Sequence, residues 1–366
     1  MKELILHIGT FKTGTKAIQA FLRDNASILE EQGFKVPVNR RYPGASQRRN
    51  GHFLAVRSCV DSRADNYTSR HDMLAKRDYE RFAKALQTHD KIILSDEAIW
   101  LEGTRGDQFW TNLHEQITGA GVERVSIIIY LRRQDELSYS LWKQFIKTKL
   151  NVTFGKFLRR KTVVNMLDYH KTLSAIESVF GEGSVRVRVY DRRCFPEGDI
   201  VNDFCETAGI TRDERFSAPE PEINPSLSTT AAEIKRWANE SEVYRDAPNF
   251  LRGPVRDYSA RTPDGSVSSM TLEHFEKIKD TYSEGNALII SRYFNGESNA
   301  LVEWPSYDKK PWDPHSEETL RAIVQIFTDA LVLQRRKIDS IVDENKRQAA
   351  EIASLKEQLA SLLPTS

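Results

Sequence analysis

Short apolar runs alternate along this chain with longer stretches of helical pattern. The runs occupy residues 4–8, 91–94 and 125–131, and a fourth, VRVRVY at 185–190, alternates in the manner of a strand near a sheet edge. Amphipathic helical patterns lie between them, at residues 16–31, 76–88, 107–119, 134–148 and 168–179. This order predicts an α/β fold with a parallel sheet flanked by helices, in which ligands bind beyond the carboxyl ends of the strands.

The C-terminal part of the chain follows a different pattern. From about residue 316 there is no glycine, and twelve positions follow a 3-4 spacing: Val324, Phe327, Leu331, Gln334, Ile338, Ile341, Asn345, Gln348, Ile352, Leu355, Leu359 and Leu362. Nine of the twelve are apolar, and Asn345 stands at an a position, which is typical of a two-stranded coiled coil. We predict an α/β domain at 1–315 and a long C-terminal helix at 316–363, which forms a coiled coil from about residue 337. A helix that packs back on the domain is the alternative.

Composition narrows the classes of function. The 366 residues carry a formal net charge of +1, so any anion site must be local, and we expect no nucleic-acid partner. Three cysteines without C-x-x-C spacing favour a reducing compartment. Neither a signal-peptide h-region nor an apolar run of membrane-spanning length is present, so we expect a cytoplasmic protein with no transmembrane segment.

The first apolar run is joined to the first helical pattern by a turn rich in Thr and Gly, LILHIGTFKTGTKAIQAFL at residues 4–22. Strand, glycine-bearing turn and helix is the layout of a P-loop-type phosphate site. Gly9 and Gly14 have the separation of a Walker A loop, but Thr15 replaces its lysine and Lys16 replaces its Mg²⁺-binding hydroxyl. The lysine that could enter the loop is Lys12. The sequence therefore predicts a phosphate site that does not match a triphosphate with its metal.

A second candidate anion site follows the third apolar run, in YLRRQDELSYSLWKQ at residues 130–144. Arg132 stands at the strand end, and Ser140 lies two turns into the next helix. An arginine fork and a serine hydroxyl can converge on one anion. The alternatives are a structural pair between Arg132 and Asp135 and a plain helix serine, and the pattern leaves open whether Arg133 faces solvent. Two anion sites in one sheet predict a ligand with two separated phosphates.

With these residues the sequence resembles the sulfotransferases that use 3′-phosphoadenosine 5′-phosphosulfate. The turn KTGT after the first strand resembles their 5′-phosphosulfate loop, and the arginine with a serine eight residues later resembles their 3′-phosphate site. Further stretches resemble bacterial members of the family: LSDEAIW at 94–100, VYDRRCFPEGDIVNDFCETAGI at 189–210 and INPSLS at 223–228. The resemblance spans most of residues 1–300.

The resemblance implies transfer of a sulfuryl group from 3′-phosphoadenosine 5′-phosphosulfate to a hydroxyl, without a metal. It assigns Lys12 to the bridging oxygen of the donor and Arg132 with Ser140 to the 3′-phosphate. The 5′-phosphate would lie on the backbone amides of Thr13, Gly14, Thr15, Lys16 and Ala17, with an added contact from the Thr15 hydroxyl. Many members have Ser or Thr where this chain has Lys16, which puts that one contact in doubt.

Sulfuryl transfer to a hydroxyl needs a base, and two residues are candidates. Glu97 in LSDEAIW matches the catalytic glutamate of carbohydrate sulfotransferases, and His52 in NGHF is the alternative because cytosolic family members use a histidine. In the structural alternative, Asp96 and Glu97 only cap the following helix. The resemblance favours a carbohydrate or glycolipid acceptor, and the basic stretch at 39–50 near His52 could bind it.

Two other functions remain open at this point. The segment IILSDE resembles an apolar strand that ends in an acidic Mg²⁺ ligand, which would suit a P-loop nucleotide kinase or NTPase with a divergent Walker A loop. A nucleotide-sensing scaffold, assembled as a homodimer by its coiled coil, would bind without turnover. The eight histidines show no metal-ligand spacing, so we predict no metal site.

Overall fold

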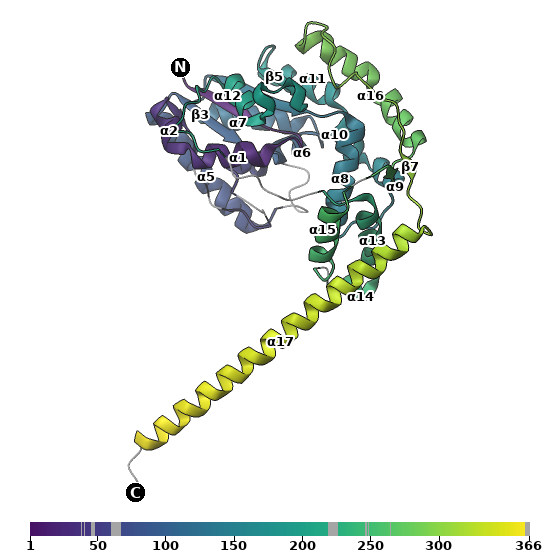
Figure 1. Ribbon diagram of the computed structural model, residues 1–366. Coiled ribbons are helices and arrows are strands. Elements are labelled where there is room, and N and C mark those ends of the chain that lie inside the picture. Colours follow the sequence, from purple (N-terminus) through teal and green to yellow (C-terminus); the bar gives the residue numbers. More distant parts are fainter. Residues whose placement is uncertain are drawn as a thin grey trace. The chain divides into compact units, whose positions relative to one another are not determined.

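The computed structural model describes most of the chain (Figure 1). Described are residues 1–37, 39, 41–44, 48–59, 67–218, 226–245, 247, 249–263 and 265–362. Contacts group the chain into two compact units, the first of residues 1–142, 154–224 and 270–308, and the second of residues 143–153, 225–269 and 309–366. This grouping joins the long C-terminal helix to residues 225–269, whereas the sequence placed a boundary near residue 316.

The first unit is organised around one parallel sheet with the strand order β2-β3-β1-β4-β5. The strands are β1 (Glu3–His7), β2 (Phe34–Lys35), β3 (Lys91–Ser95), β4 (Arg124–Leu131) and β5 (Val185–Val189). The α/β class and the parallel sheet are thus confirmed, as is the edge position of the alternating strand β5. The sequence missed β2, which forms the opposite edge and has only two residues.

Helices accompany this sheet, and four of them begin within one residue of a predicted start, whereas the helix predicted at 76–88 already begins at Ser69. They are α1 (Thr15–Asp24), α2 (Ala26–Glu31), α3 (His52–Ser58), α5 (Ser69–Thr88), α6 (Ala98–Gly103), α7 (Gln108–Gly119), α8 (Gln134–Thr148), α9 (Phe154–Leu158), α10 (Lys161–Leu167), α11 (Tyr169–Phe180), α12 (Ile200–Ala208) and α16 (Leu272–Tyr293), with short 3₁₀ turns at Arg192–Cys194 and Pro196–Gly198. The single helical pattern at 16–31 is divided into α1 and α2 at Asn25, whose side chain donates to the Phe21 carbonyl.

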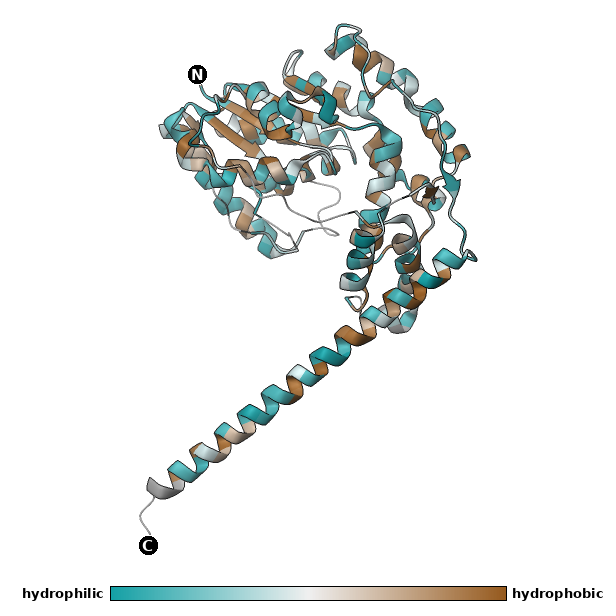
Figure 2. Cartoon of the chain, in the orientation of Figure 1, coloured by the Kyte–Doolittle hydropathy of each residue, from teal (hydrophilic) through white to brown (hydrophobic). Residues whose placement is uncertain are grey.

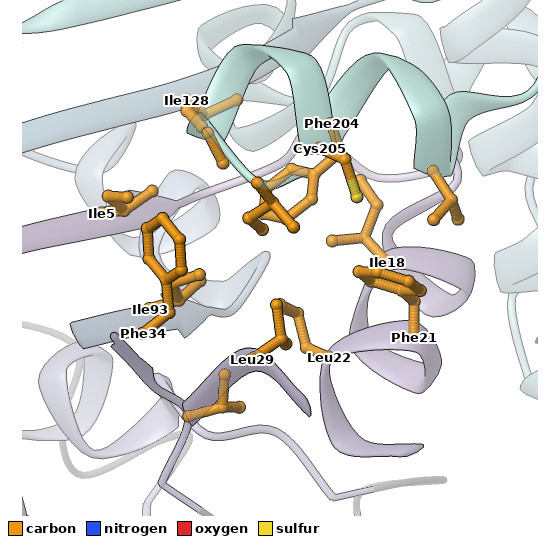
Figure 3. Close-up of a cluster of buried hydrophobic side chains, with 14 of the residues drawn as sticks. Ile5, Ile18, Phe21, Leu22, Leu29, Phe34, Ile93, Ile128, Phe204 and Cys205 are labelled. Carbon is orange, nitrogen blue, oxygen red and sulfur yellow. The ribbon is translucent and has the colours of Figure 1, made fainter. Parts of the chain in front are cut away.

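The core beside α1 holds this helix against the sheet (Figure 3). Ile18 and Phe21 of α1 point toward Phe204 of α12, and Ile5 and Ile128 supply the sheet side of the same cluster. Each side chain is almost completely buried, which stabilises the packing by about 1.5–3 kcal/mol per side chain. The start of α1 is thereby fixed at the carboxyl edge of β1.

The second unit contains α13 (Thr229–Glu240), α14 (Glu242–Arg245), α15 (Arg252–Arg261), the two-residue strands β6 (Val267–Ser268) and β7 (Lys310–Pro311), and α17 (Glu317–Leu362). The predicted long C-terminal helix is confirmed as α17, which has 46 residues. Its first part packs on α13 and α15, and apolar residues recur along its length (Figure 2). Within the described ranges, none of the helices is both long and apolar enough to cross a lipid bilayer.

Candidate functional site

The loop between β1 and α1 has an unusual backbone. Gly9, Lys12 and Gly14 all adopt positive φ, at 46°, 64° and 72°. For Lys12 this conformation costs roughly 1–2 kcal/mol, since only glycine adopts it without penalty. A Cβ on Gly14 would lie 2.6 Å from Cδ1 of Ile200, so glycine is required there for space as well as for conformation. Strain of this kind collects at binding sites, which fits the predicted phosphate loop.

Threonine hydroxyls brace the loop from inside. Thr10 Oγ1 donates to the Tyr130 carbonyl of β4 at 2.9 Å, and the hydroxyls of Thr13 and Thr15 both donate to the Thr10 carbonyl, at 2.6 and 3.3 Å. All three threonines are buried. The hydroxyl of Thr15, which the resemblance assigns to the 5′-phosphate, thus has a structural partner in the loop itself.

Helix α1 presents its N-terminus to this loop. Gly14 is the N-cap residue, so no side chain caps the first amides of the helix. The first turn also carries no acidic residue. The partial positive charge of such a helix end favours an anion. Of the predicted phosphate-binding amides, that of Ala17 already donates to the Gly14 carbonyl at 2.9 Å, and a contact with phosphate would have to break this bond. Lys16 is exposed.

Arg132 lies at the end of β4, beside the same loop. Its Nη1 approaches the Lys12 carbonyl at 3.5 Å, and its Nε donates to Glu136 Oε2 at 2.9 Å. Tyr169 fixes the backbone here by donating its hydroxyl to the Arg132 carbonyl at 2.7 Å. Ser140 is partly buried and lies one helical turn beyond Glu136 on α8. The structure therefore brings Arg132 to the loop, with Glu136 between it and Ser140 along the helix.

Arg133 is held more tightly than Arg132. Its side chain is 12% exposed, against 26% for Arg132, and it pairs with Asp135 at 2.7 Å and with Glu136 at 2.9 Å. Asp135 is thus the partner of Arg133 rather than of Arg132. Of the two arginines, Arg132 is the one with more access to a ligand.

The residues after β3 form a second polar cluster. The buried Asp96 accepts from the Ala98 amide at 2.6 Å, from Arg49 Nη1 at 3.3 Å and at its other oxygen from His52 Nδ1 at 3.1 Å. Burial by itself would raise the pKa of Asp96, but Arg49, His52 and the hydrogen bonds lower it below its usual value. Asp96 thus accepts from the first amide of α6 and also anchors His52, whereas Glu97, at the N-cap position of α6, makes no side-chain cap.

Glu97 connects this cluster to α1. Its Oε2 accepts from Gln19 Nε2 at 2.9 Å, and its Oε1 lies 3.5 Å from Arg49 Nη1. The Glu97 side chain is 20% exposed, whereas the His52 side chain is only 6% exposed and its ring lies edge-on to the Tyr42 ring, with 4.6 Å between the centroids. The helix that begins at the phosphate loop therefore touches Glu97 directly, and Glu97 is the more accessible of the two candidate bases.

Sequence reasoning missed several residues of this site. Gln19 and Glu136 looked like ordinary helix residues, and Arg49 was one of several arginines in the basic stretch at 39–50. Part of that stretch, and residues 223–225 of INPSLS, lie outside the described residues. Among the residues that the structure does describe, no three His, Cys, Asp or Glu side chains gather in a way that could hold a metal ion. The absence of a metal from the function stays a prediction.

Comparison with known proteins gives three findings. No family model matches the chain. It is similar to an uncharacterized protein from Archaeoglobus fulgidus, with 34% identity over 223 residues that span 58% of this chain and 59% of that protein.

The structure is similar to a crystal structure of a sulfotransferase from Alicyclobacillus acidocaldarius, with a TM-score of 0.39, 13% identity and coverage of 71% of this chain and 98% of that one. It is also similar to the sulfotransferase domain from the curacin biosynthetic pathway, with a TM-score of 0.35, 12% identity and coverage of 77% and 98%. Because these TM-scores are low, we base the function on the residues of the site.

Proposed function

We propose that this chain is a sulfotransferase that moves a sulfuryl group from 3′-phosphoadenosine 5′-phosphosulfate to an acceptor hydroxyl. The observation that carries the proposal is the pairing of the β1–α1 loop with Arg132, whose Nη1 lies 3.5 Å from the Lys12 carbonyl. A phosphate loop without a Walker lysine at residue 15, and with a second cation beside it, suits a donor that has two phosphate-bearing ends and no γ-phosphate.

In the proposed reaction, different residues of the chain bind the two phosphates, stabilise the leaving group and accept the proton. The loop amides at the start of α1 hold the 5′-phosphate, and Arg132 with Ser140 holds the 3′-phosphate. The acceptor oxygen forms a bond to sulfur as the bond between sulfur and the bridging oxygen breaks, and 3′,5′-bisphosphoadenosine leaves. Lys12 stabilises the charge that develops on the leaving phosphate. The proton of the acceptor hydroxyl passes to the base.

Glu97 is our first candidate for that base, with His52 second. Access supports Glu97, and Gln19 and Arg49 orient its carboxylate from opposite sides. Burial of His52 against Asp96 supports a positioning role for the histidine. Once an acceptor is found, Glu97→Gln should abolish turnover while it leaves donor binding within about twofold. His52→Gln should do the same if the assignment is reversed.

The nucleotide specificity can be tested by calorimetric titration with 3′,5′-bisphosphoadenosine and, separately, with ATP and Mg²⁺. We expect Mg²⁺-independent binding of the bisphosphate, weakened at least about tenfold by Arg132→Ala and by Lys12→Ala, because each removes a cation from a phosphate. Arg124→Ala is the matched control, since Arg124 lies at the other end of β4 and pairs with Glu3.

Preference for Mg·ATP in that titration would instead favour the P-loop nucleotide kinase or NTPase. Binding of the bisphosphate without sulfuryl transfer to any hydroxyl tested would favour the nucleotide-sensing scaffold. A carbohydrate or glycolipid acceptor, a homodimer formed through a coiled coil, and a cytoplasmic location complete the proposal. They rest on the sequence resemblance, on the 3-4 spacing in α17 and on the use of cysteine, respectively.

A further inference from the structure

Helix α17 has two apolar faces with different surroundings. One face packs within the second unit, where Thr319, Ala322, Ile326 and Ala330 are buried. On the other face, Leu320, Val324, Phe327 and Leu331 are between 39% and 67% exposed. The exposed face carries the 3-4 spacing. The helices of the second unit cover the other face of α17 and leave this one exposed. We call this exposed face the α17 stripe.

The α17 stripe continues beyond the packed part of the helix. Ile338, Ile341, Ile352, Leu355 and Leu359 extend it, each more than half exposed, and every side chain from 335 to 359 is exposed. A helix with no packing partner is only marginally stable in water, and a continuous exposed apolar stripe marks a binding surface. A partner helix with the same spacing would cover it.

We propose that the partner is a second copy of this chain, in a parallel, in-register two-stranded coiled coil. This inference deepens the proposed homodimer and does not depend on sulfuryl transfer. In that arrangement each core position meets its own copy, so Asn345, Gln348 and Gln334 pair with themselves and every apolar position meets an apolar one. A buried polar residue that meets its own copy fixes register.

The antiparallel arrangement fits less well. The alignment that keeps polar residues together places Asn345 opposite Gln348 of the second copy, and it then places Leu359 opposite Gln334. Burial of an amide against leucine leaves its polar atoms without partners, which costs about 1–3 kcal/mol. The core residues therefore favour the parallel orientation.

Charges beside the core lead to the same choice. In the parallel, in-register dimer, Glu351 at a g position faces Lys356 at the following e position of the second copy, twice per dimer. In the antiparallel alignment Glu344 would face Glu351, and Arg335 would face Lys356, so like charges meet on both sides. All four side chains are exposed on α17 and open to such contacts.

Disulfide trapping tests the orientation on the full-length chain, with the exposed Cys194 replaced by serine. Leu355→Cys should oxidise to a disulfide-linked dimer, because a parallel dimer brings residue 355 next to its own copy. Glu357→Cys, which points away from the core, is the matched control and should stay monomeric on a non-reducing gel. In the antiparallel dimer the two copies of residue 355 would lie about 25 Å apart, since residue 355 would face residue 338.

Two outcomes would contradict the parallel homodimer. A disulfide that forms only when Ile338→Cys and Leu355→Cys chains are mixed would establish the antiparallel dimer and overturn the proposal. A monomer by light scattering at tens of micromolar protein would overturn the second copy as partner.

Exchanging the charges of residues 351 and 356 distinguishes an effect on the orientation of the dimer from an effect on the folding of the helix. Glu351→Lys should raise the dimer dissociation constant on the order of tenfold, and Glu351→Lys with Lys356→Glu should restore it. Failure of the double exchange to restore the dimer would contradict the parallel register.

Discussion

Removal of the Glu136 carboxylate should tighten the binding of 3′,5′-bisphosphoadenosine. Glu136 Oε2 accepts from Arg132 Nε at 2.9 Å, and Ser140 follows Glu136 by one turn on α8. The phosphate proposed to bind between Arg132 and Ser140 must therefore take the place of Glu136 at the guanidinium and come close to its negative charge. In the Glu136→Gln variant the phosphate displaces a weaker partner of Arg132 and meets no negative charge at residue 136. The amide oxygen of the glutamine can still accept from Arg133.

The size of the effect follows from exposure and distance. The Glu136 side chain is 41% exposed, so its pair with Arg132 is screened and contributes about 0.2–1 kcal/mol. Repulsion between the carboxylate and a phosphate about 4 Å away adds about 1 kcal/mol in a water-like dielectric. Part of this is offset because the carboxylate can move away. A net gain of about 1 kcal/mol predicts binding about fivefold tighter.

Titration calorimetry at low salt, where surface charges are least screened, measures this directly. The matched control is Glu123→Gln, which removes one carboxylate from the opposite edge of the sheet, where Glu123 accepts from the Lys2 amide. The control should leave the affinity unchanged. If Glu136→Gln binds the bisphosphate no better than the control does, the phosphate does not lie at Arg132 and the assignment of the 3′-phosphate site fails.

Two further predictions concern stability. Gly14→Ala should lower the free energy of unfolding by about 1–3 kcal/mol more than Gly209→Ala. Both glycines have φ 72°, but only at Gly14 would the new Cβ clash, with Ile200. Urea unfolding compares the two variants, and equal losses would show that Ile200 moves aside without cost. Burial lowers the pKa of His7 to about 3, so between pH 6.5 and 3 the unfolded chain binds a proton that the folded chain does not. Acidification through that range should cost about 1.4 kcal/mol per pH unit from this group, and His7→Leu should lose this dependence in urea titrations at pH 7, 6 and 5. An unchanged pH dependence in the variant would refute it.

The elements of the sheet could be predicted because each has a strong local signal. The runs at 91–94 and 125–131 are rich in isoleucine and other apolar residues, and the structure has strands at both. The two residues of β2 carry no such signal, since Phe34 and Lys35 become a strand only by pairing with β3. The second unit was also beyond local pattern, because it gathers residues 143–153, 225–269 and 309 onward, which lie far apart in the sequence.

The candidate site likewise combines residues that local pattern can identify with contacts that only the folded structure reveals. Lys12 and Arg132 could be predicted to lie at one edge because the carboxyl ends of parallel strands meet there, and Glu97 was named from its match to the catalytic glutamate of the resembling family. Which side chains pair there depends on packing between distant segments. Arg49 bridges Asp96 and Glu97 across more than forty positions of sequence, and no spacing rule connects it to them. The contrast between Arg132 and Arg133 likewise required the contacts of Asp135 and Glu136.

The contacts of Thr15 bear on the choice between the two enzymatic functions. A Walker A lysine would have to stand at this position, but the Thr15 side chain is buried, donates to the Thr10 carbonyl and would lie 2.8 Å from a Cβ on Gly9. A lysine at residue 15 would remove that hydroxyl and push a long cation into the space that it fills. Thr15→Lys should therefore disturb the loop rather than create a triphosphate site. Packing around Thr15 thus disfavours a Walker A lysine at this position and supports the proposed sulfotransferase over the nucleotide kinase or NTPase.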